Sequence, residues 1–368
     1  MSARRDGRPV RVAATLLGAL RSPASLRTLE LPEWEVLLSC ARRNAVLAYL
    51  GERSTAAGEI DAFPPQAQKA MRAAMTAVGR LAQLARWELE RVRRVLGPAG
   101  IPVIALKGGA YLLRGLPHAR TRPMSDVDVM VPHAAIDAAE EALLEAGWQG
   151  TKVDAYDQAY YRRWSHEIPP LQFPGRLLSV DVHHTICPPV SRLRPDPERF
   201  WANSQPSAMD GVRLLSPPDS VLHAAVHLFF DSDFDGRFRD LVDVHEMLEA
   251  FGREAGFWPA LVESARLQGL ARPLYYACVT RRTVLGAATP DDVLRELERY
   301  RPAAPVDAWM KRTLATLLTP ADPADWPPAH RGLLWLMYAR SHWLRMPPHL
   351  LVPHLVRKSF RRWRSPSG

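Results

Sequence analysis

The sequence predicts an α+β protein in which a mixed β-sheet is flanked by helical regions. Two regions, residues 1–99 and 217–356, carry apolar residues at helical spacing. Between them, residues 100–190 contain short apolar or alternating segments that are typical of strands. A helical segment lies between two of these strand segments, as expected where a helix crosses between strands of one sheet. We therefore expect a central α/β unit with helices before and after it.

The N-terminal region is expected to hold two amphipathic helices. The first follows a helical stripe that begins at Trp34 and that Gly51 breaks. The second is the longest of the chain, runs from Gln66 onward and ends at Gly97-Pro98. Its seam suits packing within the chain, which we favour, or a coiled-coil dimer. The seam residues are Met71, Met75, Val78, Ala82, Ala85, Leu89, Val92 and Leu96.

A strand and a glycine turn open the α/β unit. Residues 101–106 are apolar, and their proline stands near the start, where a missing N–H is tolerated. Lys107, Gly108 and Gly109 follow. The glycines let the backbone approach a ligand, and the N–H groups of a following helix would face an anion. The chain has only five lysines among 48 basic residues, which suggests that Lys107 is selected as a compact charge near phosphate.

Two carboxylates, Asp126 and Asp128, lie on the next predicted strand. Residues two apart on a strand share a face at a spacing of about 6–7 Å, so Val127 and Val129 would point into a core. Carboxylates on one face repel each other unless a cation lies between them, and their oxygens suit Mg²⁺ shared with substrate phosphates. A lone Asp-x-Asp is usually a solvated strand end, so the prediction depends on the order of strand, turn and carboxylates.

A third carboxylate, Asp181, belongs to an alternating segment that ends at His184. It can join Asp126 and Asp128 if its strand lies beside theirs. His183 shares the face of Asp181 and is expected in a supporting role, whereas His184 points to the other side. The apolar residues of the opposite face are Leu178, Val180 and Val182.

Weaker signals lie between these strands and after them. Pro132 and Gly147 bound a helix, residues 148–153 suit a strand, and residues 166–173, which contain two prolines, suit an edge strand. The proline- and arginine-rich residues 191–216 read as a linker.

The C-terminal region reads as a series of helices, the first of which runs from Ser220 to Phe230 with Asp219 as its cap. His223 and His227 have the spacing of zinc ligands but lack the glutamate of a zinc-protease motif. We interpret them as packed or substrate-pocket histidines. Further helices are expected at 259–267, 273–282, 291–300, 306–318 and 330–344, and a basic tail at 357–368. The tail is either a solvated end or a contact for RNA or anionic lipid.

Composition bounds the partners and the compartment. The formal charge of +9 and the pI near 9.8 suit polyanionic partners, which include nucleotides and nucleic acid. Alternatively, they reflect only an arginine-rich composition. Cys40, Cys187 and Cys278 have neither disulfide-framework nor zinc-ligand spacing, which predicts a reducing, cytoplasmic location. No apolar run has the length of a membrane span. The first 25 residues faintly resemble a signal peptide but equally suit a first helix.

The motifs resemble those of a bacterial family of uncharacterised nucleotidyltransferases in the DNA polymerase beta-like superfamily. The resemblance lies in Leu106-Lys107-Gly108, in Arg122-Pro123-Met124-Ser125-Asp126-Val127-Asp128 and in the region of Asp181, and spans roughly residues 100–190. It continues more weakly over residues 221–250, with Arg239-Asp240-Leu241-Val242-Asp243 as its second element. Sixteen residues separate Gly109 from Asp126, more than in the compact superfamily pattern.

The resemblance implies a polymerase beta-like core and transfer of a nucleoside monophosphate from a triphosphate to a hydroxyl, with release of pyrophosphate. Asp126 and Asp128 would bind two Mg²⁺ ions, or Mn²⁺ in their place, and Asp181 would bind the ion beside the acceptor. The implied nucleotide-binding residues are Lys107, Gly108, Gly109, Arg120, Arg122 and Ser125. The acceptor would be a protein, a peptide, RNA or a small molecule. Alternatives are phosphotransfer to a peptide hydroxyl and a non-catalytic nucleotide-binding module.

Overall fold

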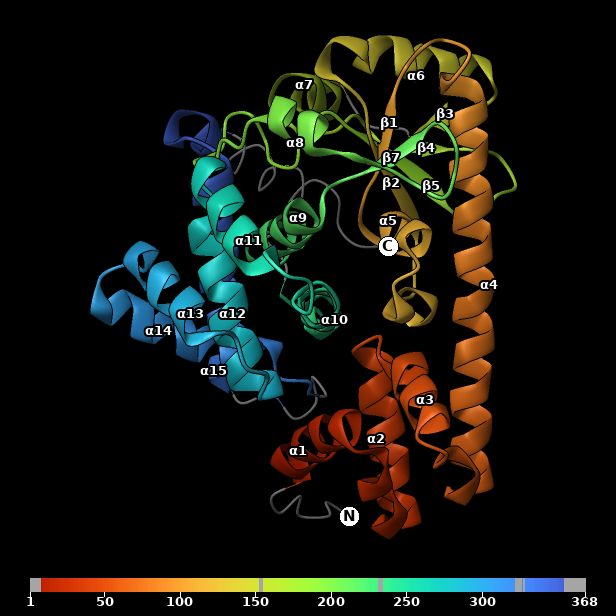
Figure 1. The fold of residues 1–368 in the computed structure, drawn as a ribbon, viewed down its shortest axis with the longest axis vertical. Helices are drawn as coiled ribbons and strands as arrows, with labels where there is room; N and C mark the ends of the chain where they lie inside the picture. Colours follow the sequence, from red (N-terminus) through yellow and green to blue (C-terminus); the bar gives the residue numbers. More distant parts are fainter. Residues whose placement is uncertain (1–7, 152–154, 231–233, 322–325, 327, 354–368) are drawn as a thin grey trace.

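The computed structural model describes residues 8–151, 155–230, 234–321, 326 and 328–353. It confirms the α+β fold class: one mixed seven-stranded sheet lies at the top of the view in Figure 1, with the N-terminal helices below it and the C-terminal helices to its left. The strand order is β3-β4-β5-β2-β1-β7-β6. The strands are β1 (Val103–Ala105), β2 (Asp126–Met130), β3 (Gln149–Gly150), β4 (Leu171–Gln172), β5 (Ser179–His183), β6 (Gln205–Pro206) and β7 (Val212–Leu214).

The helices before and within the sheet region include several short 3-10 turns, written η. Before the sheet come α1 (Arg8–Arg21), η1 (Pro23–Thr28), α2 (Leu31–Arg43), α3 (Leu47–Ala56), η2 (Ile60–Ala62) and α4 (Pro65–Leu96). Within it come α5 (Lys107–Arg114), η3 (Pro117–Thr121), η4 (His133–Ala135), α6 (Ile136–Glu145), α7 (Ala155–Trp164) and α8 (Pro197–Asn203).

The predicted long helix is α4, which runs along one side of the molecule from the N-terminal helices to the sheet (Figure 1). Its seam packs within the chain, against α3, α5 and α6. Every predicted seam residue is buried except Met75, which is partly buried. Buried Glu88 of α4 also accepts hydrogen bonds from Trp148 and Arg176. These bonds join the segments next to β3 and β5 to this helix.

The predicted break at Gly51 is wrong. The helix ends earlier, at Arg43, and Ala45 has a left-handed φ of 55°. Gly51 lies inside α3, where a Cβ would stand 3.1 Å from Cβ of Met71 and 3.3 Å from Sδ of Met75. The glycine therefore permits close packing of α3 on α4, and chain reversal is left to the residues after Arg43.

The predicted linker over residues 191–216 is also wrong, because this segment supplies α8, β6 and β7. β7 pairs in parallel with β1, with Val103 opposite Val212, and β6 pairs antiparallel with β7. Val212 and Leu214 are buried in the core. Strands of two and three residues are too short for an alternating pattern to be read, and the prolines of the segment dominate its composition.

Two smaller expectations also need correction. The expected edge strand over residues 166–173 contains β4, which lies between β3 and β5 rather than at the edge. Its two prolines precede Leu171 and so remove no hydrogen bond from the strand. The expected strand over 148–153 is reduced to β3, and residues 152–153 lie outside the described residues.

The C-terminal helices are confirmed close to their predicted positions. They are α9 (Pro217–Phe230), α10 (Phe238–Phe251), α11 (Phe257–Leu267), α12 (Ala271–Leu285), α13 (Asp291–Leu297), η5 (Glu298–Tyr300), α14 (Ala304–Leu318) and α15 (Pro328–Arg345). Asp219 is not the cap of α9: it lies within the helix, its backbone N–H donates to Ser216 Oγ, and its carboxylate accepts from Ser264 on α11. The predicted tail lies outside the described residues.

Cys40, Cys187 and Cys278 are buried and form no disulfide. Among the described residues, every helix is too short or too polar to span a lipid bilayer.

Candidate active site

The three predicted carboxylates lie on two neighbouring strands. β2 and β5 pair in parallel, with Asp128 opposite Asp181 and with Asp126 two residues before Asp128. Neighbouring strands lie about 4.8 Å apart, so Asp128 and Asp181 stand side by side. The apolar residues expected on the opposite face are all fully buried: Val127, Val129, Val180 and Val182. The alternation seen in the sequence therefore describes both strands.

Lys107 forms an ion pair with Asp128. Its Nζ lies 2.7 Å from Asp128 Oδ1, and Nε2 of His183 lies 3.1 Å from the same oxygen. The Asp128 side chain is only 4% exposed. Burial alone would raise the pKa of Asp128, but Lys107 and His183 outweigh it and hold that pKa well below its ordinary value. His183 thus lies against Asp128, and its supporting role stays a prediction.

Lys107 is also the first residue of α5, where its backbone has a left-handed φ of 43°. A non-glycine residue in this region is strained. The N–H of Leu106 donates to the carbonyl of Asp128 at 3.0 Å, which fixes the start of the turn to β2. The N–H groups of the first turn of α5 have no partner within the helix and carry its positive dipole end.

The sequence predicts a glycine turn before a helix, but Gly108 and Gly109 lie within the first turn of α5, where packing explains them. A Cβ at Gly108 would lie 2.6 Å from Sδ of Met124, and one at Gly109 would lie 3.1 Å from Cδ1 of Leu89 on α4. The first would require a shift of its neighbour, and the second is tighter than ordinary contacts. The sequence predicts that these glycines let the backbone approach a ligand. The packing does not contradict this, and their role in nucleotide binding stays a prediction.

Asp126 and Asp181 lack the compensation that Asp128 has. Burial, followed by the charges of Asp128 and Glu167, raises the pKa of Asp181 to about 7. Burial and then Asp128 also raise the pKa of Asp126, against the effect of Lys107. Oδ1 of Asp181 is buried without a hydrogen-bond partner. Two of the three carboxylates are therefore held where a positive charge would stabilise them.

Glu167 belongs to the same cluster and was not predicted from the sequence. It forms an isolated antiparallel bridge with His183, and its Oε2 lies 3.4 Å from Nδ1 of that histidine. The same oxygen lies 3.7 Å from Nε2 of His166. The only sequence signal was a His-Glu pair ahead of two prolines, which no motif covers.

The loop before β2 is held by the C-terminal helices through a buried charged network. Nε of Arg122 donates to Asp243 of α10 at 2.7 Å, and Nη2 lies 3.6 Å from Asp240. Arg239 donates to Asp243 at 3.0 Å and to the carbonyl of His118 at 2.9 Å. Burial opposes ionisation of Asp243, but the two arginines lower its pKa. The Arg-x-hydrophobic-hydrophobic-Asp element thus anchors the loop that leads into β2.

Near this site, His223 of α9 is buried and His227 is partly buried. Burial, with Lys107 and His183 as the next causes, lowers the pKa of His223 to about 3. Burial and Lys107 likewise hold the pKa of His227 well below its ordinary value. Lys107 lowers the pKa of both histidines, so this part of α9 lies near the carboxylate cluster. This agrees with the interpretation of packed or pocket histidines.

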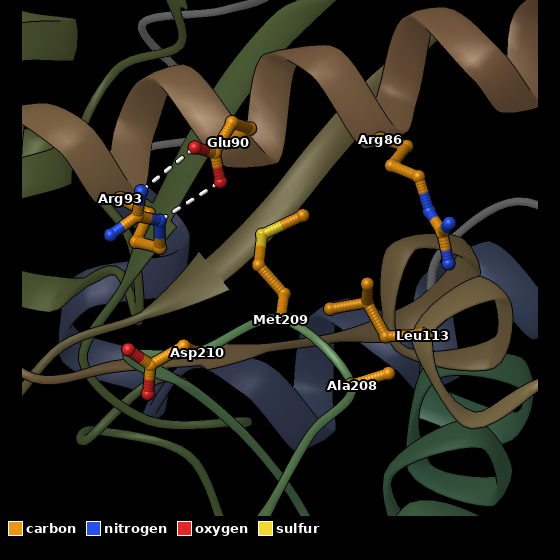
Figure 2. A pocket seen from close by; sticks show the side chains of 7 residues that line it. All are labelled: Arg86, Glu90, Arg93, Leu113, Ala208, Met209 and Asp210. Atoms are coloured by element: carbon orange, nitrogen blue, oxygen red, sulfur yellow. Dashed lines mark hydrogen bonds and ion pairs between the residues drawn. The ribbon is translucent and has the colours of Figure 1, made fainter.

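Two predicted nucleotide-binding residues, Arg120 and Ser125, lie away from the ion pairs and hydrogen bonds of the carboxylate cluster. Ser125 is exposed at the bend before β2. Arg120 lines a cavity of about 510 Å³ beside α4 and the end of α5. Figure 2 shows the adjoining cavity of about 370 Å³, where Arg93 binds Glu90 beside Met209. No residue of the three-carboxylate set lines either cavity, and the roles of Arg120 and Ser125 stay predictions.

Comparison with known proteins gives one match. A family described as uncharacterised nucleotidyltransferase matches residues 30–286. No curated protein and no solved structure matches the chain. The matched residues run from α2 to the end of α12 and so contain the whole sheet, the carboxylate cluster and the α10 network. Because the match covers well over half of the sequence, the chain belongs to this family of uncharacterised nucleotidyltransferases.

Proposed function

We propose that the protein is a nucleotidyltransferase with a polymerase beta-like core, which transfers a nucleoside monophosphate from a triphosphate to a hydroxyl acceptor and releases pyrophosphate. The observation that carries this proposal is the parallel pairing of Asp128 with Asp181, with Asp126 on the same face. The mixed sheet, the start of α5 at Lys107 and the family match support it.

The donor set at the carboxylates fits a hard divalent cation. Oδ1 of Asp181 is buried without a partner, and the pKa of both Asp126 and Asp181 is raised, as expected for acidic groups that lack a counter-charge. Carboxylate oxygens are the ligands that Mg²⁺ prefers, and Mn²⁺ accepts the same donors. We propose that Asp126, Asp128 and Asp181 hold two such ions. When bound, they would offset the charge of the triphosphate and of the leaving pyrophosphate.

The start of α5 supplies the proposed triphosphate site. The N–H groups of Lys107, Gly108 and Gly109 precede the first intrahelical hydrogen bond of Ala110, and a helix N-terminus of this kind binds phosphate oxygens. The ammonium group of Lys107 adds a full positive charge beside them. Its present partner is Asp128. Binding of the triphosphate to Lys107 and of a metal ion to Asp128 would each compete with this ion pair.

The acceptor hydroxyl would attack the α-phosphorus. A bond forms between the hydroxyl oxygen and phosphorus while the bond to the bridging oxygen breaks, and that electron pair leaves with pyrophosphate. Asp181 would accept the hydroxyl proton, because in the proposed arrangement it is the carboxylate beside the acceptor. His183 would hold Asp128 in place through Nε2.

Position-specific labelling tests this function. The protein is incubated with Mg²⁺ and each of the four triphosphates, labelled at the α- or the γ-phosphate, in the presence of an extract that supplies acceptors. Label from the α-position in a macromolecular or small-molecule product, absent with Asp128→Asn, supports nucleotidyl transfer. Label from the γ-position alone would show phosphotransfer instead. Absence of both labels with all four triphosphates would contradict the proposal.

A further inference from the structure

A second group of possible metal ligands lies beside the carboxylates, where residues 166–168 pair with the end of β5. His166, Glu167 and His183 each offer one ligand atom, and these atoms all lie within 4.8 Å of one another. Among the described residues, the ligand atoms of this group already lie close enough together to share one metal ion. It contains two imidazoles and one carboxylate, unlike the all-oxygen set of Asp126, Asp128 and Asp181.

One nitrogen of His183 is left without a hydrogen bond. The side chain is 2% exposed, and Nδ1 has no hydrogen-bond partner although Glu167 Oε2 lies 3.4 Å away. Nδ1 of His166 is likewise buried and unpartnered. Buried polar atoms normally have partners, and those that lack one call for an explanation such as a missing ion.

The other nitrogen of His183 has the partner that a metal-bound histidine usually has. Its Nε2 lies 3.1 Å from Oδ1 of Asp128. A histidine that donates one N–H to a carboxylate has its tautomer fixed, and its second nitrogen then presents a lone pair to the metal. In His183 that second nitrogen is the unpartnered Nδ1, which faces Glu167.

The backbone holds the three ligands firmly. Glu167 forms an antiparallel bridge with His183, the carbonyl of His166 accepts from the N–H of His184 at 2.9 Å, and the N–H of Ile168 donates to Val182 at 3.0 Å. Residues 166–168 are thus fixed to β5. Ligands held on paired backbone keep the geometry that a metal requires.

We propose that His166, Glu167 and His183 bind one transition-metal ion, with Zn²⁺ as the best fit. Imidazole nitrogen favours Zn²⁺ over Mg²⁺, and two histidines with one glutamate form a three-ligand set that leaves a fourth position for water or a substrate oxygen. The cations facing His166 are Lys107 and Arg345. The anions facing His183 are Asp128 and Glu167. This site goes beyond the proposed transfer reaction, which uses the carboxylates.

Metal titration of the full chain, without nucleotide, tests the site. Protein freed of metal by a chelator is titrated with Zn²⁺ by calorimetry, and with Co²⁺ as a probe whose visible absorption reports imidazole ligands. We expect one Zn²⁺ per chain that excess Mg²⁺ does not displace. We expect His166→Ala and Glu167→Gln to weaken Zn²⁺ binding more than about 10-fold, which is the lower end of the losses seen when only a hydrogen-bond partner of a metal ligand is changed.

Two control variants separate this site from the others. His133→Gln removes an exposed histidine outside the cluster and should leave Zn²⁺ binding unchanged. Asp126→Asn removes a ligand of the proposed Mg²⁺ site and should also leave it unchanged, whatever its effect on transfer. Because no nucleotide is present, Zn²⁺ binding through His166 in a protein that shows no transfer would uphold this inference while contradicting the proposed function.

Three outcomes would overturn the inference. They are the absence of stoichiometric Zn²⁺ binding by the wild type, unchanged binding in both His166→Ala and Glu167→Gln, and an equal loss in Asp126→Asn. Circular dichroism establishes that each variant is folded. If His166→Ala does not fold, the nearly isosteric Glu167→Gln decides.

Discussion

The carboxylate of Asp243, on α10, lies 2.7 Å from Nε of Arg122, in the loop that leads into β2. Asp243 also accepts from Arg239, which donates to the carbonyl of His118. All of these groups are buried or nearly so. The C-terminal helices and the strand that carries Asp126 and Asp128 therefore share one charged network.

Asp243→Asn should destabilise the protein strongly. The change leaves the guanidinium groups of Arg122 and Arg239 buried without their anion, and loss of one partner of a buried pair costs about 3–5 kcal/mol. Urea unfolding measures the effect. The control is Glu263→Gln, which breaks an exposed pair with Arg266 and should leave the urea midpoint almost unchanged. Equal effects of the two changes would contradict the anchoring role of α10.

Asp128→Asn should abolish nucleotide transfer and lower the stability of the metal-free protein. Repulsion among the carboxylates alone would make this change stabilising. The ion pair at 2.7 Å reverses that expectation, because the change leaves the largely buried Lys107 without its counter-charge. The double variant Asp128→Asn with Lys107→Met should recover stability but not transfer. Thermal unfolding and the labelling assay measure the two effects separately.

Stability of the metal-free protein should fall as the pH rises toward neutrality. The pKa of Asp181 is about 7, above its ordinary value, because of burial and the charges of Asp128 and Glu167. A raised carboxyl pKa stabilises the folded state below the unfolded pKa of about 4, and that stability is lost as the pH rises through 7. Asp181→Asn removes the effect.

The pH experiment compares melting temperatures of the wild type and Asp181→Asn from pH 4 to pH 8. The two should agree at pH 4, and the variant should be more stable at pH 8 by up to a few kcal/mol, since each pKa unit corresponds to about 1.4 kcal/mol. Mg²⁺ should reduce the difference if Asp181 is a metal ligand. A constant difference at every pH would show that Asp181 ionises normally.

Mg²⁺ with a nucleoside triphosphate should raise the melting temperature, because a ligand that binds the folded state stabilises it. At a concentration of about 100 times the dissociation constant this amounts to about 2.7 kcal/mol. Lys107→Met should reduce the shift, since the ammonium group at the start of α5 is lost. Lys311→Met, which removes a lysine on α14, is the matched control and should leave the shift unchanged. If none of four triphosphates shifts the wild type, nucleotide binding is excluded.

The sequence predicts the elements of this protein where the pattern is long or strongly alternating. The seam of α4 and the alternation around Asp181 are of this kind, and both are found as expected. β7 has three residues, too few for a pattern, and its place beside β1 depends on tertiary pairing. The helix ends at Arg43 and not at Gly51. The glycine serves the close packing of α3 on α4 and does not reverse the chain.

At the candidate site, residue types could be predicted but contacts could not. Lys107 and Asp128 were both singled out, yet their ion pair depends on how the turn before α5 sits against β2. Arg122 was expected to face phosphate, whereas its guanidinium lies against Asp243, which is far away in the chain. Glu167 is brought to His183 by a single backbone bridge. Such long-range relationships leave no periodic signal in the sequence.

The pairing of β1 with β7 sets the order in which the protein can be completed during synthesis. A chain leaves the ribosome from its N-terminus, so β1 emerges long before Leu214 has been added. Until then β2 covers one edge of β1 and the other edge is open, which in an apolar strand invites pairing with a second chain. The middle of the sheet therefore closes late, and a fragment that stops at residue 190 would keep that edge exposed.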